Sequence, residues 1–305
     1  MTGEGDARDR GERTVFSSFI VWYLVLAGAG SGALAVASAS ELRRAPGTGS
    51  VAGPASLGRV GFVVAPPLVA LASFVLMLDL GRPERIWGVV LHPFHSVASI
   101  GAFSLTVTFV LAVATVVGLF MWKRPGAAAV RALLVANIAF ALVTMAYSGL
   151  LLSTLRSVPF WETPLIPVLF VVSSLSSGIA CIMVAGFFLS TDDRGADALW
   201  TWSTVLSLVE LVVLVALLVQ AAASGVAAQH ALGELLHGSA ALLFWPGIVG
   251  AGIVFPIVCH ALSHVFPRQV LVLASMIGVL AGTVCLRYGI VDVGIGTIEA
   301  AGTVL

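Results

Sequence analysis

The residues that could do chemistry in this sequence are the few ionisable and phenolic side chains inside long apolar segments. Glu210 is the clearest, because it stands in the middle of the apolar run 206–218. A carboxyl group there could carry protons, or it could be neutral and hydrogen-bonded between helices. Asn137 is expected to join two helices. Arg287 is expected near the end of its segment, where snorkelling or a loop carboxylate would satisfy its charge.

Two tyrosines lie at similar depths within apolar segments. Tyr147 lies about one and a half turns before the end of its segment, and Tyr23, next to Trp22, is similarly deep in the first. A phenol at this depth can hydrogen-bond a ligand carbonyl. An ordinary tyrosine of an aromatic belt would occupy the same depth without binding anything, so both interpretations stay open.

The segment 79–85, which reads Asp-Leu-Gly-Arg-Pro-Glu-Arg, follows an apolar run and alternates acids with arginines. Gly81 and Pro83 are expected to stop the helix, because proline cannot continue a helix from its interior. The turn is either self-neutralised at the membrane surface, or it is a docking surface or a proton entry point beside a site.

Metal-binding patterns are sparse. The three cysteines (Cys181, Cys259 and Cys285) stand singly in apolar segments and form no CxxC pair, so neither an iron–sulfur nor a zinc site is predicted in this chain. A haem in a helical bundle needs two histidines at one depth on different helices. One haem held by His95 and His237 stays open, whereas two haems across the membrane are not supported.

Composition decides the class of protein. Of the 305 residues, 59% are hydrophobic and 10% are charged, against roughly 25% charged in a soluble domain. The mean hydropathy is +1.07. So few charges could not cover a soluble protein of this length. The sequence predicts an all-α, multi-pass membrane protein in a lipid bilayer, and nothing in it points to nucleic acid.

Eight apolar runs are long enough to cross a bilayer as helices, since a span needs about 20 residues. The predicted spans are 16–40, 57–78, 95–122, 130–152, 165–190, 199–223, 239–263 and 268–290. A polar tail covers residues 1–15. The remaining residues are expected to form two four-helix bundles, 16–155 and 156–305.

Orientation follows from arginine and lysine in the loops. Eight lie in the loops after odd-numbered spans and three in the loops after even-numbered spans. The odd loops are therefore expected in the cytoplasm of a bacterium or archaeon, and both termini outside its cytoplasmic membrane. The outer face then carries the turn after residue 78, the bend 153–164 and the segment 225–238.

The bend and its flanks, residues 147–178, lie at the middle of the chain. Phe160 and Trp161 are expected in an aromatic belt at the membrane surface. A faint echo relates residues 28–32 to residues 174–178, at an offset of about 146. Both segments carry small residues that allow close helix packing, and an internal duplication is about as plausible as chance similarity.

Several motifs together carry a family resemblance. They are WYLVLAGAGSGA in the first span, LDLGRPERIW after the second, YSGLLLS ending the fourth, and VPFWETPLIPVLFVVSSLSSG leading into the fifth. This pattern, over about the first 190 residues, resembles the NrfD/polysulfide-reductase family of membrane subunits, which includes anchor subunits of the DMSO reductase type.

The resemblance implies a membrane anchor without haem or iron–sulfur clusters of its own. Such a subunit binds a quinone, here expected to be menaquinone, near the outer face. It exchanges electrons with a docked ferredoxin-like iron–sulfur subunit, and that subunit serves a molybdopterin catalytic subunit. The quinone contacts would be Tyr147, Tyr23, Trp22 and His92. Proton transfer would involve Asp79, Arg82, Glu84 and Glu210.

Two other functions remain as rivals. A haem-b quinol cytochrome would use the histidines, and a secondary transporter would use the possible repeat and Glu210. A transporter also needs helices broken at the membrane midplane in both halves. Pro246 and Pro256 have no clear counterparts in the first half.

Overall fold

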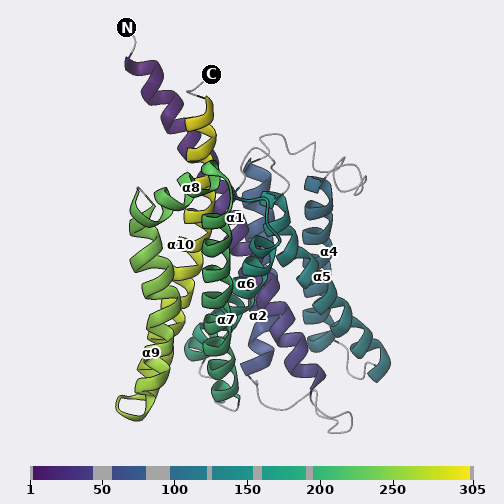
Figure 1. The fold of residues 1–305 in the computed structure, drawn as a ribbon. Coiled ribbons are helices and arrows are strands. Elements are labelled where there is room, and N and C mark those ends of the chain that lie inside the picture. The colour runs from purple at the N-terminus through teal and green to yellow at the C-terminus, as the bar shows by residue number, and fades with distance from the viewer. Residues whose placement is uncertain are drawn as a thin grey trace.

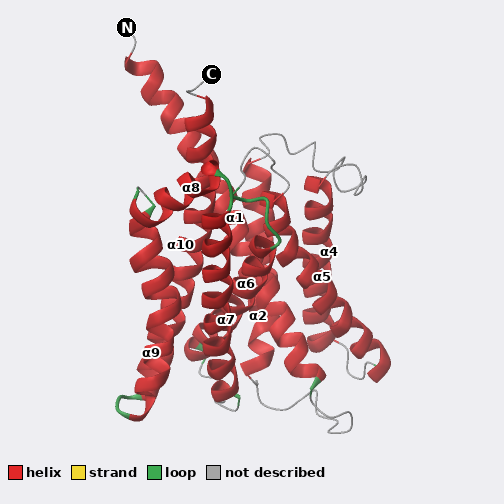
Figure 2. Cartoon of the chain, viewed as in Figure 1, coloured by secondary structure: helices red, strands yellow, loops and turns green. Residues whose placement is uncertain are grey.

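The fold is a bundle of long helices. The computed structural model describes residues 3–43, 57–79, 97–121, 126–153, 160–189, 195–238 and 240–302. Every regular element within these ranges is a helix (Figures 1 and 2). The elements are α1 (Gly3–Leu42), α2 (Leu57–Asp79), α4 (Val97–Met121), α5 (Ala127–Ser153), α6 (Leu165–Phe188), α7 (Ala196–Ala223), α8 (Val226–His237), η1 (Leu243–Val254), α9 (Phe255–Ala261), η2 (Leu262–His264) and α10 (Arg268–Gly302).

The prediction of eight membrane spans is confirmed. Eight helical stretches among the described residues are long and apolar enough to cross a bilayer. They are Phe19–Leu42, Leu57–Leu78, Ser99–Gly118, Ala128–Ser153, Leu165–Phe188, Ala196–Ala223, Leu243–His264 and Arg268–Gly294. The backbone of α1 is helical from Gly3, so the part of the predicted polar tail that the structure describes is continuous with the first span.

Two helices form the centre of the bundle. In the most apolar window of α1 72% of residues are buried, and in that of α6 67%, against 28–39% in the six other spans. Accordingly α1 packs against α2, α5, α6 and α10, whereas α7 and α4 expose broad apolar faces. The peripheral spans thus present their hydrophobic side chains where lipid would lie.

The two central helices approach each other through small residues. A Cβ on Gly32 would overlap the backbone of Ser174, and a Cβ on Gly178 would overlap the backbone of Gly32 and Ala33. Positions 28 and 174, and likewise 32 and 178, therefore face each other across the α1–α6 contact. These are the positions that the sequence echo pairs at an offset of 146.

The seventh span is not the single helix predicted over 239–263. It consists of the π-helix η1, the short helix α9 and the 3₁₀ turn η2. Pro246 lies inside η1 and cannot donate a backbone hydrogen bond. The wider π turn, in which the N–H of Phe255 donates to the carbonyl of Gly250 five residues earlier, accommodates such a break.

The segment 225–238, predicted as a loop, forms the amphipathic helix α8 (Figure 1). Its buried residues Ala228, Ala231 and Leu235 recur at helical spacing. Trp245 of η1 donates its indole N–H to the carbonyl of Leu236 over 3.1 Å. Helix α8 is thereby fixed to the next span at the end of the bundle that carries both termini.

The bend before α6 is folded into the protein, so its predicted place in a surface aromatic belt is wrong. Phe160 is 3% exposed and Trp161 2% exposed. The Trp161 indole N–H donates to the carbonyl of Ile290 over 3.0 Å, and the ring lies against Gly294, where a Cβ would overlap it. A buried indole needs such a partner, and α10 supplies it.

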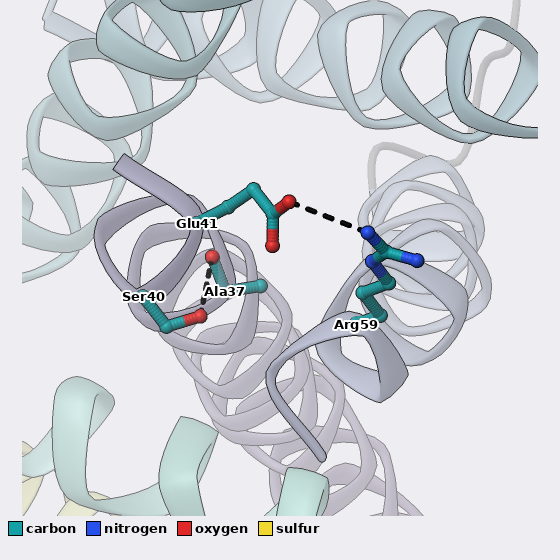
Figure 3. Close-up of polar contacts among 4 residues, drawn as sticks. All are labelled: Ala37, Ser40, Glu41 and Arg59. Atoms are coloured by element: carbon teal, nitrogen blue, oxygen red, sulfur yellow. Dashed lines mark hydrogen bonds and ion pairs between the residues drawn. The ribbon is translucent and has the colours of Figure 1, made fainter. Parts of the chain in front are cut away.

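The end of the bundle opposite the two termini carries the described arginines at and near the short connections, which are Arg43, Arg59, Arg131 and Arg268. We call it the basic end, and we call the end with both termini the terminal end (Figure 1). Figure 3 shows one contact at the basic end, where Arg59 of α2 pairs with Glu41 of α1 at 3.5 Å. Ser40 caps the same turn by donating to the carbonyl of Ala37 over 2.8 Å.

Candidate functional site

Two polar groups of residues stand out within the apolar bundle. The first is the phenol pair, Tyr23 of α1 and Tyr147 of α5. Tyr23 is 3% exposed and Tyr147 6% exposed, and the two rings are close enough to interact electrostatically. Both phenols are therefore buried at one depth, as the sequence predicts. Both belong to the half of their spans nearer the terminal end.

The backbone of α4 determines where the Tyr147 ring lies. A Cβ on Gly101 would overlap the Cε1, Cζ and Cδ1 atoms of that ring, so the ring lies flat against the glycine. Two residues further along α5, Gly149 lets that helix approach Pro167 at the start of α6. Gly101 alone thus leaves the ring a slot that a larger residue would close, and sequence reasoning missed Gly101 because a lone glycine in an apolar helix has many explanations.

Trp22 turns away from the phenol pair. Its side chain is 45% exposed, whereas the adjacent Tyr23 is buried, as expected for neighbours about 100° apart on a helix. An amphipathic ring exposed on a membrane helix suits the lipid interface. The structure therefore does not place Trp22 beside Tyr147, although it does place it at the same depth on α1.

The expected proton-transfer residues around the turn after α2 cannot be placed. Asp79 is the last residue of α2, and its side chain lies outside what the structure describes. Arg82, Glu84 and His92 also lie outside the described residues, as does His95. Their roles stay predictions.

The second polar group is centred on Arg287 of α10. The prediction that this side chain lies near the end of its span and is satisfied at the surface is wrong. Arg287 is 0% exposed and does not reach the surface. Its Nε donates to the carbonyl of Leu24 over 3.1 Å, and its Nη2 donates to Ser174 Oγ over 2.8 Å. Its Nη1 lies 3.3 Å from Ser173 Oγ and 3.5 Å from the carbonyl of Thr283.

The reason for the error is the length of α10. The sequence suggested that the last span ends near residue 290, but the helix continues to Gly302 and its apolar stretch to Gly294. Arg287 therefore lies well inside the bundle, with its guanidinium 5.2 Å from the centre of the Phe170 ring.

Glu210 of α7 supplies the opposite charge. It is 6% exposed, and its carboxyl group lies near enough to Arg287 and Ser173 to feel their electrostatic influence. A charge inside a membrane protein is costly unless other groups compensate it, and Arg287 meets this condition through its hydrogen bonds to Leu24 and Ser174. We call Glu210, Arg287, Ser173 and Ser174 the buried charge cluster. The sequence marked Glu210 and the serines separately but gave no sign that they meet.

Gly28 of α1 makes room for the buried charge cluster. A Cβ there would lie 2.5 Å from Arg287 Nη2 and 2.6 Å from Ser174 Oγ. Because Leu24 accepts from Arg287 and the next residue toward the terminal end is Tyr23, the cluster and the phenol pair meet on the same turn of α1. The two polar groups are therefore neighbours along one helix.

Other predicted residues have structural partners. Asn137 Nδ2 donates to Thr115 Oγ1 over 2.8 Å, which confirms that this amide joins α5 to α4. Thr108 and Thr144 form a second link between these helices at 2.9 Å. Both contacts are buried and stabilise the pair of helices that carries Gly101 and Tyr147.

The described histidines lie at the two ends of the bundle. His230 and His237 are exposed on α8, and His260 and His264 lie near the basic end. Among the residues that the structure describes, no three His, Cys, Asp or Glu side chains gather as a metal site. The cysteines are unpaired, and Cys259 is buried.

Two phenols at one depth can donate hydrogen bonds to the oxygens of a flat carbonyl-bearing ring, as in a quinone head group. Their burial against Gly101 excludes water from the Tyr147 ring. The donor set therefore fits a quinone or quinol, and the adjacent exposed Trp22 faces the lipid phase from which such a hydrophobic molecule would come.

Known proteins resemble the chain along almost its whole length. The family model described as "Polysulphide reductase, NrfD" matches residues 7–299. A polysulfide reductase polypeptide of Wolinella succinogenes is 29% identical over 302 residues, which cover 90% of this chain and 94% of that protein. Protein NrfD of Escherichia coli K12 is 29% identical over 308 residues, or 93% of this chain and 96% of that protein.

A more distant relative covers less of the chain. A selenate reductase subunit of Mesobacillus selenatarsenatis is 26% identical over 146 residues, which cover 46% of this chain and 34% of that protein. The family match extends the resemblance from the first 190 residues to both halves of the bundle. This multi-pass membrane protein belongs to the NrfD/polysulphide reductase family.

Proposed function

We propose that the chain is the quinol-reactive membrane subunit of a reductase complex, with the phenol pair as its quinone site. The burial of Tyr23 and Tyr147 at one depth is the observation that carries the proposal, because two such donors could serve the two oxygens of a quinone ring. The relatives named as parts of polysulfide reductase and selenate reductase support a place in such a complex.

The chain's own residues would bind and orient the ring. Tyr147, held against Gly101, would hydrogen-bond one ring oxygen, and Tyr23 would do so from α1. Trp22 would line the entry from lipid, and His92 would complete the site from the segment after α2. Oxidation of one quinol to a quinone releases two electrons and two protons. Menaquinol is the expected form.

The electrons and the protons released from the quinol would leave the site by different routes. The electrons would leave to a ferredoxin-like iron–sulfur subunit docked at the terminal end, and from there pass to a molybdopterin catalytic subunit. The protons would leave through Asp79, Glu84 or His92, with Arg82 holding the turn. Glu210 would accept a proton within the membrane, beside Arg287. On this proposal, the membrane protein contributes binding and proton transfer, and its partners contribute the metal centres.

The test is to purify the tagged chain in mild detergent with whatever partners remain bound. The bound quinone and iron, and the rate of electron transfer from a soluble quinol analogue, would then be measured. We expect Tyr147→Phe and Tyr23→Phe to lose bound quinone and to slow quinol oxidation. Tyr288→Phe is the matched control, because it removes the third tyrosine of the sequence from a half-buried position on α10.

Three results would contradict the proposal. One is quinone content and quinol oxidation that do not change in either tyrosine variant. Another is a haem absorbance band in the purified protein, which would favour a quinol cytochrome that uses its histidines. The last is a protein that purifies alone without iron or quinone, which would favour a transporter built around Glu210.

A further inference from the structure

We propose that polar side chains of α6, α7 and α9 form a passage for water that opens at the basic end and stops at Glu210 and Arg287. It deepens the proton role given to Glu210 under the proposed function by stating from which side a proton reaches that carboxyl group. The existence of the passage does not depend on quinol binding.

The buried face of α7 changes character at Glu210. From the basic end toward the middle of the helix, this face consists of Trp200, Ser203, Ser207 and Glu210. Spacings of three and four residues put all four on one side of a helix. Beyond Glu210 the same face continues with Leu214, Leu217 and Ala221. The face is thus polar on the basic side of Glu210 and apolar on the terminal side.

The ion pair between Asp197 at the start of α7 and Arg268 at the start of α10 fixes the direction of this change. Both residues mark the basic end, so the polar half of the face begins there. Arg268 also lies over the Trp200 ring, 5.6 Å from its centre. The first residue of the polar face therefore lies directly beneath the charged surface of the basic end.

Several buried polar atoms along this route have no hydrogen-bond partner among the described residues. They are Trp200 Nε1, Ser203 Oγ, Ser176 Oγ and His260 Nδ1. Trp200 is 2% exposed, and Ser203 and Ser176 are 0% exposed. Buried donors and acceptors that lack protein partners are usually satisfied by water. The structure leaves no water-sized space beside these four atoms on α6, α7 and α9, so they mark where a row of water molecules would enter when the helices separate slightly.

Ser176 extends the route along α6. It lies one helical turn from Ser173 toward the basic end, and Ser173 Oγ lies 3.3 Å from Nη1 of Arg287. On α7, Ser207 lies one turn from Glu210 in the same direction. Ser176 and Ser207 therefore continue the polar surface of the buried charge cluster toward Ser203 and Trp200.

His260 is placed at the mouth of the passage. Its ring packs edge-on against Trp200, with the ring centres 4.6 Å apart. The side chain is half-buried, so it lies between the surface of the basic end and the buried Trp200 ring. A water molecule between His260 Nδ1 and Trp200 Nε1 would be the first of the row.

The passage ends at the buried charge cluster. The groups facing Glu210 are the guanidinium of Arg287 from α10 and the hydroxyl of Ser173 from α6, and α1 contributes only backbone, through Leu24, to this cluster. Leu214 and Leu217 are 3% and 2% exposed and fill the α7 face beyond Glu210. A proton at Glu210 would thus exchange with the basic end and not, along this face, with the terminal end.

The test is the accessibility of single cysteines in membrane vesicles that contain the full-length protein. The three native cysteines are first replaced by alanine, and Ser203→Cys, Ser207→Cys or Ser176→Cys is introduced. The controls are Leu214→Cys on the same face beyond Glu210, and Val212→Cys, which is 67% exposed on the lipid side. A hydrophilic methanethiosulfonate reagent is added to sealed vesicles of each orientation.

We expect the three former serines to react at least about tenfold faster than the two controls, because only a hydrated thiol ionises readily to the reactive thiolate. The reagent should act only from the side on which the basic end lies. Size-exclusion chromatography shows which variants fold, and Ser176→Cys probes the opposite wall if an α7 variant does not. Rates no faster than those of Val212→Cys, or equal labelling of Leu214→Cys, would overturn the passage.

A second measurement separates this inference from the proposed function. If the serine positions are labelled but Glu210→Gln leaves quinol oxidation and proton release unchanged, the passage stands and the proton role of Glu210 falls. If the positions are not labelled while Tyr147→Phe abolishes quinol oxidation, the quinone site stands and the passage falls.

Discussion

Replacing Arg287 by methionine is expected to destabilise the bundle strongly, and more than the loss of any surface arginine. The substitution removes the cation that faces Glu210, together with donors to the carbonyls of Leu24 and Thr283 and to two serine hydroxyls. Leaving a buried acceptor unsatisfied costs about 1–3 kcal/mol, so losing several of these bonds and the charge beside Glu210 together should cost about 3–5 kcal/mol. We expect a loss of that size in the free energy of unfolding.

The double variant tests whether this cost comes from the pair. Glu210→Gln alone leaves Arg287 without a nearby negative charge, so it too should be costly. In the double variant Arg287→Met, Glu210→Gln neither charge remains. Its cost should fall short of the sum of the single costs by about 0.5–3 kcal/mol, the range found for residues in contact or in one polar network.

The assay is reversible unfolding of the purified protein in mixed detergent micelles, followed by tryptophan fluorescence. Arg131→Met is the matched control, because Arg131 is exposed on α5, and its loss should change the free energy of unfolding by no more than about 0.5 kcal/mol. Single costs that add within about 0.5 kcal/mol would refute the electrostatic coupling between Arg287 and Glu210. An Arg287→Met protein as stable as the Arg131→Met protein would refute the burial argument as well.

Three further predictions follow from close contacts. Gly101→Ala places a methyl group in the Tyr147 ring, so it should lower quinol affinity severalfold in a titration with a quinol analogue. The control Gly233→Ala meets no neighbouring atom and should leave the affinity unchanged. Equal affinities in the two variants would contradict the slot. Trp161→Phe loses the bond to the Ile290 carbonyl and should cost about 1–3 kcal/mol in the same unfolding assay, whereas Trp202→Phe on an exposed face should cost little. Gly178→Ala puts a methyl group into the backbone of α1, so size-exclusion chromatography should show no folded protein. Gly289→Ala, whose nearest neighbour would lie at 3.5 Å, should be tolerated. Normal folding of Gly178→Ala would refute the close contact between α1 and α6.

The long spans could be predicted from the sequence because apolar length alone decides them. A helix that crosses lipid must satisfy its own backbone, and eight runs of sufficient length leave little choice. Helix α8 escaped prediction because twelve residues with glycines at both ends resemble a loop. The π-helix escaped because hydropathy does not depend on which carbonyl a backbone N–H reaches.

The sequence could predict which site residues lie near each other only where their depth along the helices decided it. Depth placed Tyr23 and Tyr147 together, because both lie a short distance from the same end of the bundle. Depth could not show that Arg287 turns inward, because its partners Leu24, Ser173 and Glu210 come from three other helices. Nor could it show that Trp161 is buried, since the acceptor on Ile290 is 129 residues away. The division into two four-helix bundles stays a prediction.

The space above Gly28 has a consequence for how relatives of this protein can diverge. Because Gly28 has no Cβ, the side chains of Arg287 and Ser174 can meet in the space that a Cβ would occupy. A relative that acquires a side chain at position 28 must therefore shorten the residue at 287, and one that loses the arginine frees position 28 to vary. Substitutions at these two positions should be correlated across the family, and the charge at position 210 should change with them.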